Sequence, residues 1–396
     1  MRNWSVTFAT STMTPATEAL HGQLLADFRA GSKAALARAV SIVENHRDGF
    51  EEVLADQHLR LGHARRIGIT GPPGAGKSTM TSALARYFRS SGWTVGIVAV
   101  DPTSPFTGGA LLGDRIRMED VALDPGVFIR SMATRGSLGG LAASTREVSD
   151  VLDGFGMDVI LIETVGVGQS ELDIARAADT TLVVLVPESG DSIQTLKAGV
   201  MEIADVFVVN KADRPGADGL RRDIELMLGL RSGRAGPIRP ESRQALNDST
   251  WTAPGWIPPV LKTVASQGEG LQSVARALES HRSHLESSGE LQRRRRARLK
   301  ERVMDIVETQ IRQRLWRDSG TMKWLDSQLE DMESGRVIPY VVADRLRSRS
   351  AALLTGAQFV LRQRPVGPGN EATADLPPAS PPVSRPVSQP DSGAEN

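Results

Sequence analysis

The segment Gly71–Ser78 places the strongest constraint on how this chain can fold. It reads Gly-Pro-Pro-Gly-Ala-Gly-Lys-Ser and follows the mostly apolar run Ile67–Thr70. A strand that ends in G-x-x-x-x-G-K-S and leads into a helix predicts a phosphate-binding P-loop. The glycines let successive backbone N–H groups turn inward around an anion, and the helix N-terminus adds its positive dipole end. The sequence therefore predicts that a nucleoside triphosphate binds to Gly71, Pro72, Pro73, Gly74, Ala75, Gly76, Lys77, Ser78 and Thr79.

Two side chains of this loop have predicted chemical roles. We expect the Lys77 ammonium to reach the β- and γ-phosphates and the Ser78 hydroxyl to ligate Mg²⁺. After the loop, apolar residues recur at i, i+3, i+4, i+7 and i+8, which is typical of one buried helix face. That face would consist of Met80, Ala83, Leu84, Tyr87 and Phe88.

A second motif indicates which base is bound. The sequence Asn210-Lys-Ala-Asp213 directly follows residues 205–209, which form a predicted buried strand. The Asp213 carboxylate can accept hydrogen bonds from both the ring N1–H and the exocyclic amino group of guanine. Adenine offers no such donor pair and would leave the carboxylate unpaired. We expect Asn210 and Lys211 to fix the loop and cover the base, so the sequence favours GTP over ATP.

Acidic residues at two other predicted strand ends are candidates for holding the metal. Residues 159–162 lead into Glu163, where a Walker B carboxylate holds Mg²⁺, and Gly166 can donate its N–H to the γ-phosphate. Most GTPases have Asp at this point. Glu163 departs from that pattern, and its longer side chain needs more room or reaches farther toward the metal. Asp101 follows residues 95–100 and is a second candidate, with a helix N-cap or a turn as its alternative role.

Apolar runs of strand length alternate with helical patterns, which predicts an α/β fold. We expect a P-loop NTPase with a mostly parallel central sheet that is covered on both faces. Ligands of such sheets bind at the carboxyl ends of the strands, where the motifs above lie. The predicted strands are residues 67–70, 95–100, 159–162, 181–186, 206–209 and 259–262.

The chain is expected to divide into five segments. Two N-terminal helices would pack through Leu24, Phe28, Ala35 and Val40, and the last segment, rich in Pro and Ser, would be disordered. The segments are a flexible N-terminus (1–15), the N-terminal helices (16–62), the P-loop domain (63–285), a helical arm (286–360) and the tail (361–396).

The composition narrows the function classes. Lys plus Arg and Asp plus Glu both number 47, so the formal net charge is zero and gives no general reason to expect nucleic-acid or membrane binding. The chain has no cysteine, which excludes disulfides and thiolate metal sites. Its apolar runs are too short to cross a membrane, and it begins with no signal-peptide pattern. We therefore expect a cytoplasmic protein.

Longer strings carry a family resemblance. Together they resemble, in order, the signature of the MeaB/ArgK-type P-loop GTPases, and they cover about residues 16–356. This family comprises GTPase chaperones of adenosylcobalamin-dependent acyl-CoA mutases such as methylmalonyl-CoA mutase, and it includes the methylmalonic aciduria type A protein. The strings are residues 101–118, 128–130, 135–140 and 163–171, and the stretch 334–346 that is similar to the family's C-terminal arm.

The resemblance implies partners and a mode of action. Family members are homodimers joined by their helical C-terminal part, and they hydrolyse GTP slowly alone and faster with the mutase. The nucleotide state gates cofactor loading and removal of damaged cobalamin, so cobalamin is involved only indirectly, through the partner. Three nucleotide-responsive loops map to residues 101–117, 163–171 and 188–197, with Asp114, Asp191 and Lys197 as switch residues. From the residues alone, Lys197 could equally be a solvated helix residue.

One loop departs from the family pattern. The family usually has Ser-Ala-x before Gly-x-Gly, whereas Val264, Ala265 and Ser266 precede residues 267–270 here. Backbone N–H contacts to the base would tolerate Val264. The lost hydroxyl could have braced the Asp213 loop, so weaker nucleotide affinity is expected.

The sequence does not decide which side chains orient the attacking water and stabilise the developing charge. Phosphoryl transfer depends on positioning and electrostatics, and a partner that orders the loops would raise a slow intrinsic rate. Gln169, three residues past Gly166, is a candidate for orienting the attacking water. The candidates for internal charge stabilisation are Arg115, Arg117, Arg130 and Arg135.

Three alternatives remain. A GTP-dependent metallochaperone usually carries a His-rich or Cys-containing site, but this chain has no Cys and six scattered His, of which we expect His281 and His284 on a solvated helix surface. A transport-linked small-molecule kinase is disfavoured by the motif 210–213. A nucleic-acid binder would use the basic run 293–302, whose interleaved residues favour the solvated face of a packed helix instead.

Overall fold

The computed structural model describes residues 15–101, 118–133, 140–164, 170–187, 201–231 and 255–355. The chain forms two compact units, and the boundary between their main parts falls after Asp305. None of the described helices is long and apolar enough to cross a lipid bilayer.

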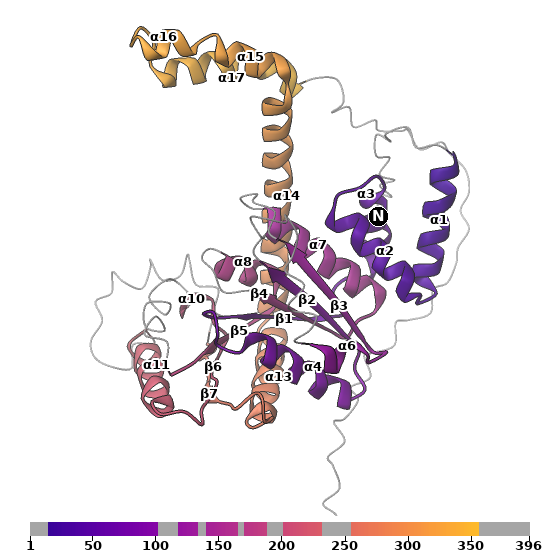
Figure 1. Cartoon of the computed structure of the whole chain (residues 1–396), viewed down its shortest axis with the longest axis vertical. Coiled ribbons are helices and arrows are strands. Elements are labelled where there is room, and N and C mark those ends of the chain that lie inside the picture. Colours follow the sequence, from indigo (N-terminus) through magenta and orange to yellow (C-terminus); the bar gives the residue numbers. More distant parts are fainter. Residues whose placement is uncertain are drawn as a thin grey trace, which may run out of the picture. The chain divides into compact units, whose positions relative to one another are not determined.

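The larger unit is built on a seven-stranded sheet (Figure 1). Its strand order is β3-β2-β4-β1-β5-β6-β7, and every neighbouring pair is parallel. This confirms the predicted α/β fold with its mostly parallel sheet. The strands are β1 (Arg65–Thr70), β2 (Val95–Asp101), β3 (Val127–Ala133), β4 (Val159–Thr164), β5 (Thr180–Leu185), β6 (Val206–Val209) and β7 (Val260–Lys262).

Helices cover both faces of the sheet (Figure 1). On one face, α4 (Lys77–Ser90), α6 (Glu119–Ala122) and α13 (Leu271–Ser287) share a core with alternate strand residues such as Ile69 and Leu161. The intervening strand residues face the other side, because successive side chains of a strand alternate. There they pack against α7 (Gly140–Phe155), α8 (Ser170–Ala177), α10 (Met201–Ile203), α11 (Ala217–Arg231) and the N-terminal helices.

The N-terminal segment has one helix more than predicted. It forms α1 (Pro15–Arg29), α2 (Lys33–Glu44), α3 (Phe50–Gln57) and the short 3₁₀ turn η1 (His58–Arg60). The break between α2 and α3 comes from two residues with positive φ, His46 (44°) and Gly49 (86°). All four residues expected to point inward, Leu24, Phe28, Ala35 and Val40, are buried.

The strand β3 is absent from the sequence prediction. It pairs with β2 alone and forms the edge of the sheet. Arg130 and Ser131 interrupt its apolar pattern and are only half-buried, because an edge strand has fewer covered positions. A period-based interpretation of the sequence therefore passes over this strand.

The C-terminal part is helical, as predicted, wherever it is described. Its helices are α14 (Glu290–Arg317), α15 (Ser319–Asp326), α16 (Leu329–Glu333) and α17 (Pro339–Thr355). Apolar residues recur at four-residue spacing along α14 and are exposed: Val303 is 62% exposed, Val307 44% and Ile311 43%.

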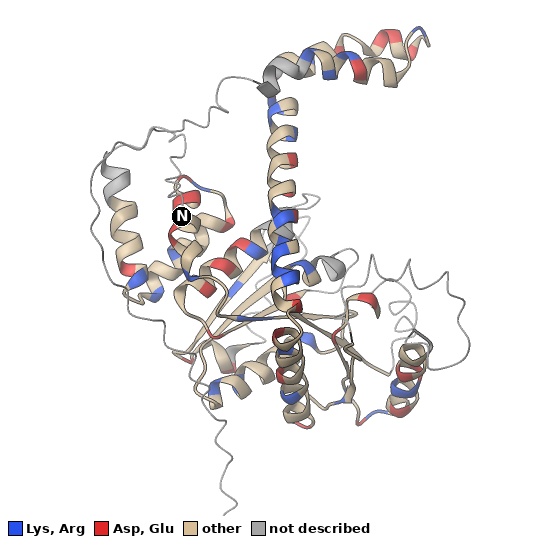
Figure 2. Ribbon diagram, turned by 180° about the vertical axis from the view of Figure 1, so that it is seen from behind, with Lys and Arg blue, Asp and Glu red and all other residues tan. Residues whose placement is uncertain are grey.

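The basic run 293–302 is only in part the solvated face that its interleaved residues predict: Arg293, Arg296 and Lys300 are exposed, whereas other arginines of the run turn inward. Figure 2 shows Lys and Arg gathered along the first turns of α14. Four of these arginines pair with acids of α7, of the turn after α8 and of the turn before β6, and those acids are buried. The pairs are Arg294–Asp205, Arg295–Asp179, Arg298–Asp179 and Arg302–Asp150.

The prediction that His281 lies on a solvated helix surface is wrong. It is completely buried, with Nδ1 2.9 Å from Thr180 Oγ1 and Nε2 3.2 Å from Asp205 Oδ1. The Trp256 ring covers it at 4.9 Å between centroids. Packing of α13 on the sheet turns His281 toward the amino ends of β5 and β6, so its partners come from distant parts of the sequence.

Candidate functional site

The P-loop, residues 71–78, links the carboxyl end of β1 to the start of α4. Gly71 has φ of 139°, and a Cβ there would overlap the carbonyl oxygen of Val184 on β5. Gly76 has φ of 88°, and a Cβ there would overlap the side-chain amide of Asn210. Both positions require glycine, since a side chain would push the loop away from the strands that support it.

Lys77 is the first residue of α4, and its side chain is buried. Its Nζ donates to the carbonyl oxygens of Gly71 at 2.8 Å and Pro72 at 3.0 Å. The ammonium thus lies within the curve of the P-loop. An ammonium held there can exchange a carbonyl oxygen for a phosphate oxygen without leaving the loop.

Glu163 connects β4 to the first turn of α4. The Ser78 hydroxyl donates to Glu163 Oε1 at 2.6 Å, and the Thr81 hydroxyl donates to Oε2 at 2.9 Å. The carboxylate is almost fully buried, with Glu163 only 3% exposed. Glu163 lies opposite Ile69 of β1 in the sheet register, so its side chain emerges beside the P-loop.

The donor set at this point suits magnesium. Mg²⁺ prefers oxygen ligands and is usually bound by one or two protein groups together with water and phosphate oxygens. The Ser78 hydroxyl and the Glu163 carboxylate offer two such oxygens 2.6 Å apart. Two protein oxygens are the number that an ion bound together with a nucleotide needs, because phosphate oxygens and water supply its remaining ligands.

Asn210 joins the P-loop to the loop after β7. Its Nδ2 donates to the Ala75 carbonyl oxygen at 2.9 Å. Its Oδ1 accepts from Thr263 Oγ1 and from the Ala265 N–H, both at 3.1 Å. Asn210 is buried, and its side chain holds two loops in register at the same edge of the sheet.

Asp213 follows Asn210 on an ordered turn. Lys211 has φ of 55°, and the Ala212 N–H donates to the Thr263 carbonyl oxygen at 3.0 Å. Asp213 is exposed. The carboxylate is therefore accessible to a ligand, while the backbone beneath it is held to the chain after β7.

The loop of Val264, Ala265 and Ser266 is tied to its neighbours through its backbone. The Val264 N–H donates to the Glu269 carbonyl oxygen at 3.2 Å, and the Ala265 N–H donates to Asn210. Two of the N–H groups that could contact a base are therefore engaged within the protein. Ser266 is exposed.

Several predicted site residues fall beyond the described part. Gly166, Gln169, Asp114, Asp191 and Lys197 lie outside it, as do Arg115, Arg117 and Arg135. Asp101 is the last residue of β2, directly after Val100, which pairs with Thr164 of β4. Its backbone is thus at the same edge of the sheet as Glu163. Arg130 forms an ion pair with Glu44 of α2.

Two residues of the site were missed by the sequence interpretation. Thr81 reaches Glu163, and Thr263 reaches Asn210. For Thr81 a signal existed, because residues three apart share a helix face and Thr81 stands three after Ser78. For Thr263 there was none, since its contact depends on how β6 and β7 pair.

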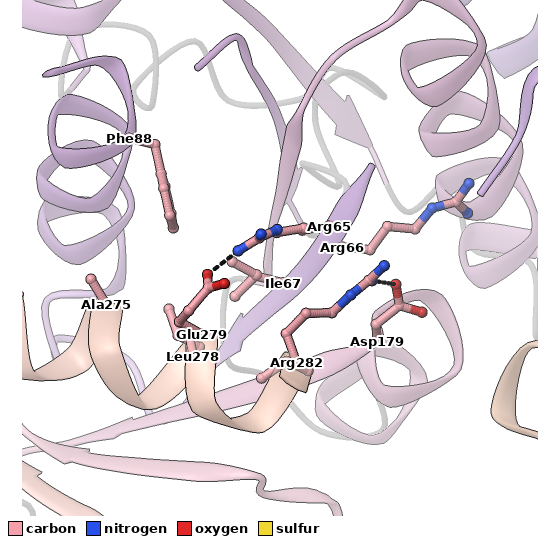
Figure 3. Close-up of a pocket in the computed structure, with 10 residues that line it drawn as sticks. Arg65, Arg66, Ile67, Phe88, Asp179, Ala275, Leu278, Glu279 and Arg282 are labelled. Carbon is pink, nitrogen blue, oxygen red and sulfur yellow. Dashed lines mark hydrogen bonds and ion pairs between the residues drawn. The ribbon is translucent and has the colours of Figure 1, made fainter. Parts of the chain in front are cut away.

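A small pocket lies away from this site (Figure 3). It is found at the amino ends of β1 and β5, beside α13. Arg65 pairs there with Glu279 and stacks over the Trp93 ring, and Arg282 pairs with Asp179. Its charged side chains thus already have partners, and the P-loop is at the opposite ends of the strands.

The chain resembles known proteins over most of its length. The profile of "Methylmalonyl Co-A mutase-associated GTPase MeaB" matches residues 36–320. A Pyrococcus abyssi protein described as a GTPase is 48% identical over 285 residues, which are 72% of this chain and 83% of the relative. GTPase ArgK of Escherichia coli is 34% identical over 299 residues, 74% of this chain and 86% of that one.

A further relative and a solved structure are also similar to this chain over most of its length. The methylmalonic aciduria type A homolog of Mus musculus, a mitochondrial protein, is 31% identical over 330 residues, covering 80% of this chain and 76% of the relative. A crystal structure described as a LAO/AO transport system kinase superimposes with a TM-score of 0.62 at 26% identity, covering 86% of this chain and 99% of that one. These matches confirm the predicted GTP hydrolase: the chain belongs to the family of methylmalonyl Co-A mutase-associated GTPases, MeaB.

Proposed function

We propose that this GTPase is the chaperone of an adenosylcobalamin-dependent acyl-CoA mutase, with methylmalonyl-CoA mutase as the client. In this role GTP binding and hydrolysis gate cofactor loading and protect or reactivate the mutase. The supporting observation is that the family profile, named for association with that mutase, spans the P-loop, the 210–213 motif and all of α14. Cobalamin would be bound by the mutase rather than by this chain.

The nucleotide site would use the groups at the carboxyl edge of the sheet. The P-loop backbone and Lys77 would hold the β- and γ-phosphates, and Asp213 would accept two hydrogen bonds from guanine. Asn210 supports this assignment because it fixes the P-loop and the loop of Val264–Ser266 to one side chain. The distance between phosphate and base sites is then set by the protein rather than by the ligand.

Magnesium would be held by Ser78 and Glu163, with Asp101 as a further candidate on the adjacent strand. When bound, the ion neutralises charge on the phosphates during hydrolysis. Ser78 and Glu163 would orient it, and the Lys77 ammonium, held within the curve of the P-loop, would stabilise the developing negative charge. We retain Gly166 as a γ-phosphate donor, Gln169 as the water-orienting candidate, and Asp114, Asp191 and Lys197 as switch residues.

A homodimer is the expected assembly. The exposed Val303, Val307 and Ile311 recur at four-residue spacing and form one apolar strip of α14, and a second copy could cover it. We assign residues 286–360 to this contact, residues 63–285 to nucleotide chemistry and 16–62 to helical support. The cytoplasm is the proposed location, which is consistent with a chain without cysteine.

Complex formation with the mutase tests this proposal. Purified protein is mixed with methylmalonyl-CoA mutase from the same organism in the presence of GDP, a non-hydrolysable GTP analogue or no nucleotide. We expect a complex whose affinity differs at least several-fold between nucleotide states, measured by calorimetry and light scattering. A Lys77→Ala variant serves as the control, since it should lose this nucleotide dependence.

Two results would contradict the proposal. Absence of any complex with methylmalonyl-CoA mutase in all three states would remove this client. GTP-dependent phosphorylation of a small-molecule acceptor would instead support a kinase, the description carried by the similar crystal structure.

A further inference from the structure

Thr81 makes contacts that set it apart from the other hydroxyls of α4. It is completely buried, one turn after Ser78 on the same helix. Its Oγ1 lies 2.9 Å from the Lys77 carbonyl oxygen and 2.9 Å from Glu163 Oε2. The hydroxyl therefore sits between the helix backbone and the carboxylate that we propose to face magnesium.

The single proton of this hydroxyl is best placed on the side of Glu163. In an α-helix the Lys77 carbonyl oxygen already accepts the backbone N–H of Thr81. An ionised carboxylate has no proton and can only accept, and hydrogen bonds to it are about twice as strong as neutral ones. Thr81 thus donates to Oε2, as Ser78 donates to Oε1 at 2.6 Å.

Both oxygens of Glu163 are in this way directed by one turn of α4. Glutamate has one more rotatable bond than the aspartate usual at this position, so its carboxylate needs more contacts to hold one orientation. A hydroxyl at i and a hydroxyl at i+3 supply two contacts from one helix face. The carboxylate plane is then fixed relative to the P-loop, because the P-loop leads directly into α4.

We propose that Thr81 is a positioning residue for the metal site. By holding Oε2, Thr81 directs Oε1 of Glu163 toward Ser78. The Ser78 hydroxyl oxygen and Glu163 Oε1 can then both face magnesium. This inference rests on the proposed nucleotide site and adds a residue whose effect on GTP hydrolysis passes through Glu163. Residues that orient a metal ligand typically change metal affinity about 10–100-fold when replaced.

The test measures magnesium dependence apart from turnover. Affinity for a fluorescent GDP analogue is measured with EDTA and across a magnesium titration for the full chain. Thr81→Val keeps the side-chain shape but removes the hydroxyl, and Thr81→Ser keeps the hydroxyl. We expect Thr81→Val to raise the magnesium midpoint about 10-fold or more, with affinity in EDTA within about twofold of wild type, and Thr81→Ser to match wild type.

Two further variants make the result decisive. Thr81→Ala gives the same expectation if Thr81→Val folds poorly, as checked by thermal unfolding. In a Glu163→Gln background, Thr81→Val should have little further effect on the magnesium midpoint, because the two residues act through one contact.

Different failures point to different errors. An unchanged magnesium midpoint in Thr81→Val, or an equal loss of affinity in EDTA, would overturn the positioning role while leaving the nucleotide site intact. Wild-type protein whose GDP affinity does not respond to magnesium would overturn the proposed metal site itself, and the role of Thr81 with it.

Discussion

Asn210 shows how one side chain can serve two loops. Its amide donates to Ala75 in the P-loop and accepts from Thr263 and Ala265, so all three contacts depend on the same buried group. Replacing it removes the link between the phosphate loop and the base loop. The motif that indicates guanine binding therefore also has a structural role at its first position.

The variant Asn210→Ala tests this linking role. The change leaves the Ala75 carbonyl and the Ala265 N–H without their partner, and each such buried group costs about 1–3 kcal/mol. We expect a loss of at least about 2 kcal/mol in unfolding free energy and weaker GTP binding, measured by denaturant unfolding and calorimetry. Gln267→Ala, at an exposed position nearby, is the control. Equal stability of the two variants would refute the linking role.

Among the elements, α14 is attached to the sheet through buried charge. Arg295 and Arg298 donate to Asp179, which follows α8, and Arg298 also donates to the Ala178 carbonyl oxygen at the end of that helix. Burial by itself raises the pKa of Asp179, but the charges of Arg298 and Arg295 outweigh it and hold the pKa well below its usual range. The carboxylate stays ionised because arginine surrounds it.

The second prediction follows from this arrangement. Asp179→Ala removes a buried carboxylate and leaves the partly buried arginines around it unpaired, and breaking a buried pair typically costs about 3–5 kcal/mol. Chemical unfolding should show that loss. The matched control is Asp218→Ala, which breaks an exposed pair with Lys262 and should leave the unfolding midpoint nearly unchanged. Similar midpoints for the two variants would show that the cluster does not stabilise the fold.

His46 joins α2 to α7 in a way that depends on pH. Its Nε2 lies 2.6 Å from Glu147 Oε2, and its ring stacks on Phe50 at 4.6 Å. The hydrogen bond to Glu147 raises the pKa of His46, burial and Arg302 of α14 oppose the rise, and Glu51 of α3 supports it. Because the folded pKa exceeds the unfolded value of about 6.5, this contact stabilises the protein fully below that pH. The stabilisation is lost as pH rises through the folded pKa.

The third prediction tests that pH dependence. His46→Asn removes the titrating group and keeps a residue that tolerates the observed φ of 44°. We expect the wild type to exceed the variant in unfolding free energy by more near pH 5.5 than near pH 8.5, measured by unfolding at both values. A difference that is constant with pH would mean that the charge on His46 does not contribute.

The elements also show what sequence patterns can and cannot predict. Strands such as β4 and β6 were predicted because both of their faces are buried and their residues are continuously apolar. The P-loop and the Asn210–Asp213 motif were found because their chemistry is local in sequence. β3 was missed because its edge position permits polar residues. The buried acids that pair with the basic run lie 89 to 152 residues away in the sequence, and pattern alone does not reveal such pairs.

For the whole molecule, the exposed apolar strip of α14 leads to the fourth prediction. Val307→Glu with Ile311→Glu places two charges on that strip and should convert a homodimer into monomers, measured by light scattering at several concentrations. Leu59→Glu is the control, because Leu59 is 94% exposed outside α14 and should leave the dimer intact. A wild-type monomer, or a dimer unaffected by the double variant, would contradict the assigned contact.

We propose that a client mutase regulates this GTPase. The most direct measurement is steady-state GTP hydrolysis by the purified protein, with and without methylmalonyl-CoA mutase from the same organism, with ATP as the control nucleotide. We expect slow turnover of GTP by the protein alone, a clear increase with the mutase, and no use of ATP. GTP turnover that is indifferent to the mutase, or equal use of ATP, would contradict it.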